Sequence, residues 1–322
     1  QAKEWLNLVE PLLSSGRAYR LPYGNADVIG AARQGRSSLL LTVKHAVDPS
    51  NPAAHLPLAI IDPTAELDNS SLKTLAKELS PSVILTCAAS VRKGVREDFG
   101  VKIIGLANTV RTGGHPQSNS DSQRRGMLLS QALLMTRESI PAVTLVTTVN
   151  DVRATAPIGW LHLQNLSTIL NGAKPVLHLP ESHAGNTILK DSWWQIQHDV
   201  GVDADGWSDL VGASPETASL TSAKFVSRTL SASLKDREAW ATDVMRPASE
   251  VIAGNGLVLH SASHFVMSSS RNEFPLTITN SLAQTVRVKV VVTSENPQRI
   301  DIPDTQVVAI QPKDCLLYTS PS

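Results

Sequence analysis

The sequence predicts a chain of mixed class, with a (β/α) barrel-like domain followed by an antiparallel β-sandwich. Up to about residue 200, apolar runs typical of buried strands alternate with helical patterns. After about residue 250 the apolar residues recur with period two and are rich in Val, Ile and Thr. At 322 residues the chain is too long for one ordinary domain. We therefore expect one domain over 1–250 and a second over 251–314, joined at Pro and Gly residues.

The first domain opens with the elements that suggest a parallel sheet. Ala2–Ser15 carries apolar residues on one helical face, and Gly16 ends it. A short strand is expected at Arg17–Leu21, because Pro22 then removes a backbone donor. Further buried strands are predicted at Leu56–Ile61 and Val83–Ala88, with helices between them at Leu39–Val47 and Leu72–Leu79. Strands that alternate with helices favour a parallel sheet, either open or closed into a barrel.

The later elements are predicted with less regular spacing. We expect a strand at Val101–Leu106, helices at Asp121–Glu138 and Leu161–Leu170, and one long or two short helices over Ser219–Arg246. Trp193, Trp194 and Trp207 stand among Gly and Asp, a pattern that favours loops packed over the sheet. The sandwich strands are expected at Leu257–Met267, Phe274–Thr279, Thr285–Thr293 and Asp301–Ile310.

Composition excludes several classes of partner and cofactor. The 29 basic residues balance 29 acidic ones, so no basic excess indicates nucleic acid. No apolar run is long enough to span a bilayer. Gly113-Gly114 lacks the Lys-Ser/Thr of a phosphate loop, so no cofactor is predicted. Cys87, inside an apolar run, is expected to be a small buried hydrophobe.

Both ends of the chain carry expectations of their own. The chain begins with Gln1 and enters a helix at once, so we expect the natural protein to begin earlier. The sandwich is expected to be cut off before its last strands. Residues 315–322 break the pattern before them and look like translated adapter sequence. We expect this tail to be artefactual, to make few apolar contacts and to join no regular ladder.

The candidate site lies just after the first strand, where α/β proteins usually bind ligands. Arg20, Tyr23 and Asn25 are candidate ligand-binding residues, for a sugar or a phosphate. Asp27 is a candidate catalytic acid or ligand. The alternative, which we favour, is that the Asp27 carboxylate caps the helix that follows and ends at Gly35.

Asp62 is the second candidate catalytic residue, at the end of the Leu56–Ile61 strand. Together with Asp27 it would supply the two carboxylates that glycoside hydrolysis needs. The alternative, again favoured, is that Asp62-Pro63 opens a turn. The two carboxylates would have to converge in one open pocket to support catalysis.

Other chemistry is indicated weakly or not at all. His178 and His183 flank Pro180, which excludes the helical zinc motif, and no metal is predicted. His260 and His264 would share one face of a sandwich strand. Neither Ser90 nor Ser182 has the Gly-x-Ser-x-Gly context of a hydrolase nucleophile.

The opening stretch from Trp5 through Leu21-Pro22-Tyr23-Gly24-Asn25-Ala26-Asp27 resembles a family of uncharacterised actinobacterial envelope proteins. The run Phe274–Asn280, followed by Val286–Val290, is similar to the sandwich domain of that family. The resemblance implies a secreted precursor that a C-terminal helix, absent from this chain, anchors in the membrane. It also implies a barrel-like central region and genes near those for export of cell-wall precursors, and it implies no established activity.

Two hypotheses of function follow. One is an extracytoplasmic envelope protein that acts as a non-catalytic scaffold or regulator of cell-wall assembly, with a cell-wall glycan or an envelope protein as partner. The other is a carbohydrate-active hydrolase with a carboxylate pair at the barrel mouth. The two differ in whether Asp27 and Asp62 are available to a substrate.

Overall fold

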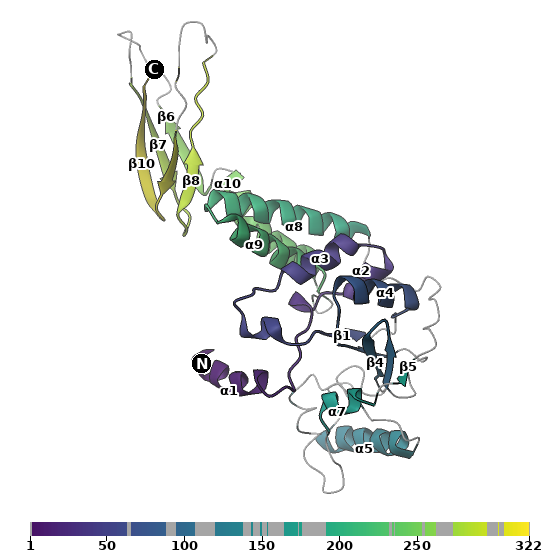
Figure 1. The fold of residues 1–322 in the computed structure, drawn as a ribbon. Helices are drawn as coiled ribbons and strands as arrows, with labels where there is room; N and C mark the ends of the chain where they lie inside the picture. Colours follow the sequence, from purple (N-terminus) through teal and green to yellow (C-terminus); the bar gives the residue numbers. More distant parts are fainter. Residues whose placement is uncertain are drawn as a thin grey trace. The chain divides into compact units, whose positions relative to one another are not determined.

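The chain contains both helices and sheets and divides into two compact units in the computed structural model (Figure 1). Unit 1 is Gln1–Asp191 with Leu230–Ser233, and unit 2 is Ser192–Thr229 with Leu234–Ser322. The structure describes residues 2–62, 66–87, 95–106, 120–137, 164–172, 174–175, 191–231, 237–252, 255–261, 273–294 and 306–321, with 143, 149, 153, 234, 236 and 302.

Unit 1 is built around a five-stranded sheet with the order β1-β2-β4-β3-β5. The strands β1 (Ala59–Asp62), β2 (Val83–Thr86) and β4 (Val101–Gly105) pair in parallel, as the apolar runs predicted. The expected strand at Arg17–Leu21 is reduced to a single parallel bridge between Arg20 and Leu58. Pro22 lacks the N–H needed to continue it, which agrees with the short pairing.

A hairpin that the sequence analysis missed inserts an antiparallel strand into this sheet. It joins β3 (Val95–Asp98) to β4 through Phe99 and Gly100. Their φ angles are 48° and 75°, and two-residue hairpins of type I′ need positive φ at both positions. On its other side β3 pairs in parallel with β5 (Lys174–Pro175).

The two faces of the sheet carry different layers. One face buries Ala59, Leu85 and Ile104 in a cluster that also takes Leu170 from α7 (Leu166–Leu170). Cys87 belongs to this cluster and is 3% exposed, as predicted. The alternate residues Ile60, Ile84 and Ile103 are buried on the opposite face, because strand side chains alternate.

The other regular elements in the described part of unit 1 are helices. Three of them, α2 (Val28–Arg33), α3 (Ser37–His45) and α4 (Asn69–Glu78), pack against one another. The remaining helices are α1 (Ala2–Leu13), α5 (Asp121–Arg137) and the short 3-10 turns η1 (Tyr23–Asn25) and η2 (Pro52–His55). The predicted helices at 2–15, 39–47, 72–79 and 121–138 are confirmed to within a few residues.

Unit 2 begins with three helices, α8 (Asp191–Leu210), α9 (Pro215–Thr229) and α10 (Arg237–Ile252). The predicted loops at Trp193, Trp194 and Trp207 are therefore wrong. Within α8 the buried side chains Val200, Ala204 and Ser208 recur every four residues and form one helical face. Packing of that face outweighs the low helix propensity of the two glycines in α8, Gly201 and Gly206.

The remaining strands of unit 2 form two antiparallel sheets. One has the order β10-β7-β6, with β6 (Leu257–Ser261), β7 (Glu273–Asn280) and β10 (Asp314–Pro321). The other pairs β8 (Val286–Lys289) with β9 (Val307–Ile310). One apolar cluster takes Ile278 from the first sheet and Val286 and Ile310 from the second, so the sheets share a core.

The expectation that 315–322 joins no regular ladder is wrong. β10 pairs with β7 in an unbroken antiparallel register from Asp314↔Asn280 to Pro321↔Glu273. Leu316 packs against the shared core, whereas Leu317 is 68% exposed. The tail sequence Leu-Leu-Tyr-Thr contains residues of high β propensity, so it can pair with the open edge of β7 whatever its origin.

The boundary between the two units differs from the predicted one at 250/251. Helices α8, α9 and α10 were assigned to the first domain from their helical pattern, but most of their residues belong to unit 2. Leu210, the last residue of α8, packs against the core of the two C-terminal sheets. Gly256, just before β6, lies between Val251 of α10 and Leu282. A Cβ atom placed on Gly256 would be 3.1 Å from Val251 Cγ2. These apolar contacts group the helices with the strands.

Candidate functional site

The helix α2 is held at both ends by contacts that the sequence encodes. At its start the Asp27 carboxylate accepts a 2.9 Å hydrogen bond from Gly30 N–H, so Asp27 is the N-cap that we favoured. At its end Gly35 has a φ of 67°, and the N–H groups of Gly35 and Arg36 bond back to Ala32 and Ala31. This is a Schellman ending, with glycine at the left-handed position.

The backbone of Asp27 is fixed by a segment that comes from far along the chain. Asp27 N–H donates to the carbonyl of Leu230 at 2.8 Å, and Ala26 forms an antiparallel bridge with Ser231. Leu230 and Ser231 are 1% and 0% exposed. The entry to α2 is therefore tied to residues about 200 positions later in sequence, which no local pattern predicts.

Asp62 ends β1 as a buried acceptor of three hydrogen bonds. Its Oδ1 accepts from Glu66 N–H at 3.1 Å, and its Oδ2 accepts from Leu67 N–H at 3.1 Å. Thr86 Oγ1, at the end of β2, donates to Oδ2 at 2.6 Å. Asp62 is only 1% exposed. Its carboxylate thus joins the end of β1 to residues 66–67 and to the end of β2, a structural role for a buried polar group. The predicted turn at Asp62-Pro63 itself lies partly outside the described residues.

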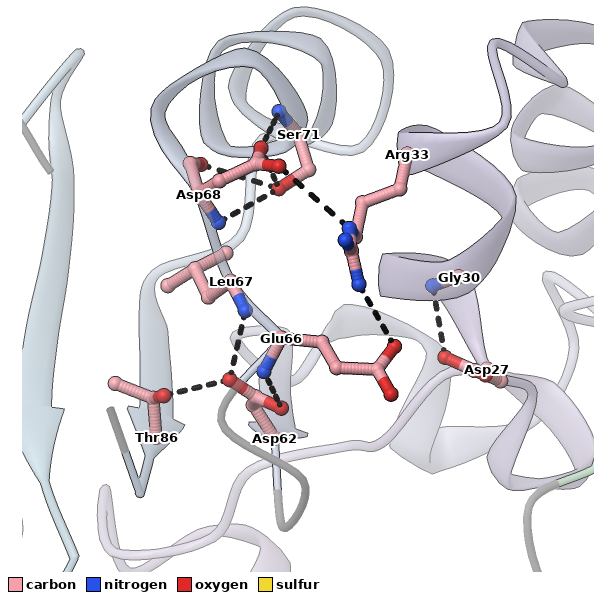
Figure 2. Close-up of polar contacts among 9 residues, drawn as sticks. All are labelled: Asp27, Gly30, Arg33, Asp62, Glu66, Leu67, Asp68, Ser71 and Thr86. Atoms are coloured by element: carbon pink, nitrogen blue, oxygen red, sulfur yellow. Dashed lines mark hydrogen bonds and ion pairs between the residues drawn. The ribbon is translucent and has the colours of Figure 1, made fainter. Parts of the chain in front are cut away.

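Arg33 joins α2 to the segment between β1 and α4 (Figure 2). Its Nη1 lies 3.2 Å from Glu66 Oε2, and its Nε lies 3.5 Å from Asp68 Oδ2. Asp68 also caps α4, because its Oδ1 accepts from Ser71 N–H at 2.7 Å while Ser71 Oγ accepts from Asp68 N–H at 3.1 Å. The helix α4 therefore has a capping box at Asp68 and begins at Asn69, three residues before the Leu72 at which we predicted the helix to begin.

Two carboxylates and one guanidinium act on the carboxyl group of Glu66. Burial is the main cause that raises the pKa of its carboxyl group, and the Asp27 carboxylate is the next. Asp62 adds to the rise, whereas the Arg33 guanidinium and its hydrogen bond lower the pKa of Glu66. The structure thus brings Asp27 and Asp62 around the same residue, Glu66, which the sequence analysis did not single out.

The candidate ligand-binding residues Arg20, Tyr23 and Asn25 precede Asp27 in the sequence. Arg20 is partly buried, its Nε has no hydrogen-bond partner within the described residues, and burial lowers its pKa. Tyr23 is 37% exposed, and Asn25 is exposed with a φ of 55°, a left-handed value that asparagine tolerates better than most residues.

Several other candidates lie outside the described residues. They are Ser90, Gly113, Gly114, His178, Ser182, His183 and His264. His260 is exposed on β6. Among the residues that the structure covers, no cluster of His, Cys, Asp and Glu has the geometry to hold a metal ion.

The sequence analysis missed Arg33, Glu66 and Asp68. Asp62-Pro-Thr-Ala-Glu66-Leu-Asp68 places three acidic residues within seven positions and no basic one, so a cation from elsewhere in the fold is required. The pattern Asp68-x-x-Ser71 also signals a helix start. Neither feature identifies Arg33 as the partner, because the contact spans more than 30 positions in sequence.

Comparisons with known proteins add no family. A scan against protein-family models gives no match, and a search of curated proteins finds no relative. Within the helices that the structure describes, none is both long and apolar enough to cross a membrane.

Proposed function

We propose that the protein is a non-catalytic scaffold or regulator of the cell envelope, located outside the cytoplasm and linked to cell-wall assembly. Its partner would be a cell-wall glycan or another envelope protein. The support for this location and role is the resemblance of the opening stretch and of the C-terminal strands, described above. Membrane attachment through a C-terminal anchor belongs to the same proposal.

The burial of Asp62 is the observation that favours a scaffold over an enzyme. A catalytic carboxylate must reach the substrate, and Asp62 is 1% exposed with both oxygens bonded to Glu66, Leu67 and Thr86. Asp27 already caps α2. Both carboxylates that would carry out hydrolysis therefore have structural roles that account for their positions.

The finer architecture is part of the same proposal. We infer a barrel-like first domain, since β1, β2 and β4 are parallel and the Arg20–Leu58 bridge adds to the β1 edge. We infer a sandwich for the C-terminal strands, since their two sheets share one apolar cluster. A crystal structure of the full chain tests both, through closure of the first sheet and face-to-face packing of the others.

The experiment that separates the two hypotheses measures binding and turnover on the same samples. The purified chain is incubated with insoluble peptidoglycan, soluble cell-wall polysaccharide and a panel of chromogenic glycosides. A scaffold binds one of the polymers and releases no reducing sugar. Turnover that is lost in Asp27→Asn or Glu66→Gln would overturn the scaffold and establish a hydrolase.

The hydrolase is kept as a second candidate because of one specific feature. Asp27 and Glu66 form an acidic pair in which the pKa of Glu66 is raised, and glycosidases use a raised carboxyl pKa for their general acid. If catalysis occurs, the pair is therefore Asp27 with Glu66 and not Asp27 with Asp62. The glycoside panel tests this assignment, since Asp62→Asn would then act through stability alone.

A further inference from the structure

Strand β6 lies at the edge of its sheet. In the order β10-β7-β6 it pairs with β7 on one side, and no strand among the described residues pairs with its other side. Proteins usually protect such an edge with a charged residue, a proline or a bulge. The stretch Leu257–Ser261 reads Leu-Val-Leu-His-Ser and keeps an unbroken register with β7, so it carries none of these devices. The edge is therefore open to another strand.

The pairing with β7 decides which backbone groups of β6 face outward. Ser281 N–H donates to the carbonyl of Gly256 at 2.8 Å, and these two residues lie opposite each other, one step beyond the pair Leu257↔Asn280. Hydrogen-bonded pairs alternate with non-bonded pairs along an antiparallel ladder, and residues of the non-bonded pairs direct their backbone groups away from the partner strand. The residues of β6 that direct their N–H and C=O groups to the free side are therefore Leu257, Leu259 and Ser261.

Leu259 is an apolar side chain left open at this edge. It is the register partner of Ile278, which is 6% exposed in the core of the C-terminal sheets. It also shares its face with Leu257, which packs against that core, because strand side chains alternate. Leu259 itself is 57% exposed. A strand added beside β6 would extend this apolar layer and cover Leu259.

We propose that β6 is a dimerisation edge whose partner is the β6 strand of a second copy of this chain. Antiparallel pairing about a twofold axis at Leu259 places Leu259 opposite its counterpart and Leu257 opposite Ser261. Every outward N–H and C=O group then has a partner, because the outward residues are spaced evenly about Leu259. The two Leu259 side chains meet on the core face. On the other face Val258 lies opposite His260, so no like charges are paired.

The length of the strand sets the strength of the dimer. A five-residue strand supplies far fewer contacts than the roughly 20–30 residues per partner of a standard complex. Association is therefore expected to be reversible and weak, in the micromolar to millimolar range. The dimer is a separate proposal from the scaffold or hydrolase function, and it holds or fails independently of both.

Sedimentation velocity of the full chain over a series of concentrations tests the dimer. The samples are kept reduced, because Cys315 is free and exposed and could otherwise link two copies. The sedimentation coefficient of the native chain is expected to rise with concentration. Leu259→Lys places like charges opposite each other at the axis and should raise the dissociation constant by about tenfold or more. Leu317→Lys on β10, where Leu317 is 68% exposed, is the matched control and should dimerise like the native chain.

A charge-pair experiment tests the register. Leu259→Lys and Leu259→Glu are each expected to stay monomeric at concentrations where the native chain dimerises. An equimolar mixture of the two should associate, because a lysine and a glutamate then face each other across the axis. This rescue requires residue 259 of one copy to lie opposite residue 259 of the other, and a loss of folding could not produce it. A mixture that stays monomeric would contradict the register.

Ser261→Pro tests the backbone bonds without adding a charge. It removes one outward donor from each copy and leaves the bonds to β7 in place, since proline is tolerated at an edge where its nitrogen faces solvent. The dissociation constant is expected to rise by about tenfold or more. Circular dichroism checks that each variant is folded. A native chain that stays monomeric up to millimolar concentration would overturn the proposal and leave the edge to a strand from another protein. Dimerisation of Leu259→Lys at the native strength would overturn it equally.

Discussion

Thr86 and Asp62 are register partners in the parallel pairing of β1 with β2, and Thr86 Oγ1 donates a 2.6 Å hydrogen bond to Asp62 Oδ2. Side chains at paired positions of parallel strands point to the same face. Both residues end their strands, so the bond joins the two strand ends. The same carboxylate also accepts from Glu66 N–H and Leu67 N–H, which lie just before α4.

Asp62→Asn is expected to destabilise unit 1 by about 2–4 kcal/mol, because an amide cannot replace a carboxylate that accepts from three donors. In asparagine an NH₂ group replaces one of the two carboxylate oxygens, and this group would face an N–H or O–H donor. Thr86→Val, which keeps the shape and removes one donor, is expected to cost about 1–2 kcal/mol. Denaturant unfolding of the purified variants measures both changes.

A double-mutant cycle gives the coupling between the two residues. The combined variant should cost less than the sum of the single ones, since Asp62 and Thr86 share one bond. Thr74→Val in α4 is the control, because the Thr74 hydroxyl makes only an exposed bond to Ser70. Additive costs for Asp62 and Thr86 would show that their bond contributes nothing to stability.

Some elements of the site follow from sequence because their causes are local. The run of apolar residues before Asp62 predicts a buried strand, and Asp27 before a short apolar helix predicts a cap. Gly35 predicts the end of that helix for the same reason. Each of these predictions uses only neighbouring residues, and the structure confirms each of them.

Other elements depend on partners that are distant in sequence. Gly201 and Gly206 weaken the local helix signal of α8, and packing of Val200 and Ala204 decides the outcome. Arg33 finds Glu66 only when α2 packs beside the end of β1. The sequence places Glu66 and Asp68 shortly after Asp62 but holds no information on which cation pairs with these carboxylates.

Asn280 is expected to be a stability determinant of unit 2. It is fully buried, and its amide nitrogen lies within 3.1 Å of the carbonyls of Gln284, Ile310 and Gln311. Its Oδ1 accepts from Leu282 N–H at 3.0 Å. Asn280→Ala leaves these backbone groups without their partner and should cost about 2–4 kcal/mol.

The free energy of unfolding of Asn280→Ala measures this cost. Amide hydrogen exchange in β7 and β9 then shows whether the loss is local to these strands. Asn255→Ala is the control, since Asn255 is exposed, and its cost should stay within about 0.5 kcal/mol. Equal stability of the two variants would mean that water replaces the bonds of Asn280.

Two glycines of unit 1 are expected to respond in opposite directions to the same substitution. Gly35 has a φ of 67°, and nothing lies within 4 Å of an added Cβ, so Gly35→Ala should cost about 1 kcal/mol from backbone strain alone. Gly126 lies within α5, also with nothing within 4 Å, so Gly126→Ala should stabilise the helix by about 0.5–1 kcal/mol. Thermal unfolding measures both signs, and a destabilising Gly126→Ala would contradict the helix there.

Leu316 and Leu317 provide the sharpest test of β10. The two are adjacent, and in a strand they point to opposite faces: Leu316 packs against the core formed with Ile278 and Ile310, whereas Leu317 is 68% exposed. Leu316→Asp should therefore destabilise unit 2 by about 1–3 kcal/mol, because it places a charge against apolar side chains. Leu317→Asp should change stability by less than about 0.5 kcal/mol. Denaturant unfolding, with amide exchange in β7 as the local probe, measures the difference. If both variants match the native protein, the tail does not pair with β7 in solution, and its removal from Cys315 onward should be equally silent.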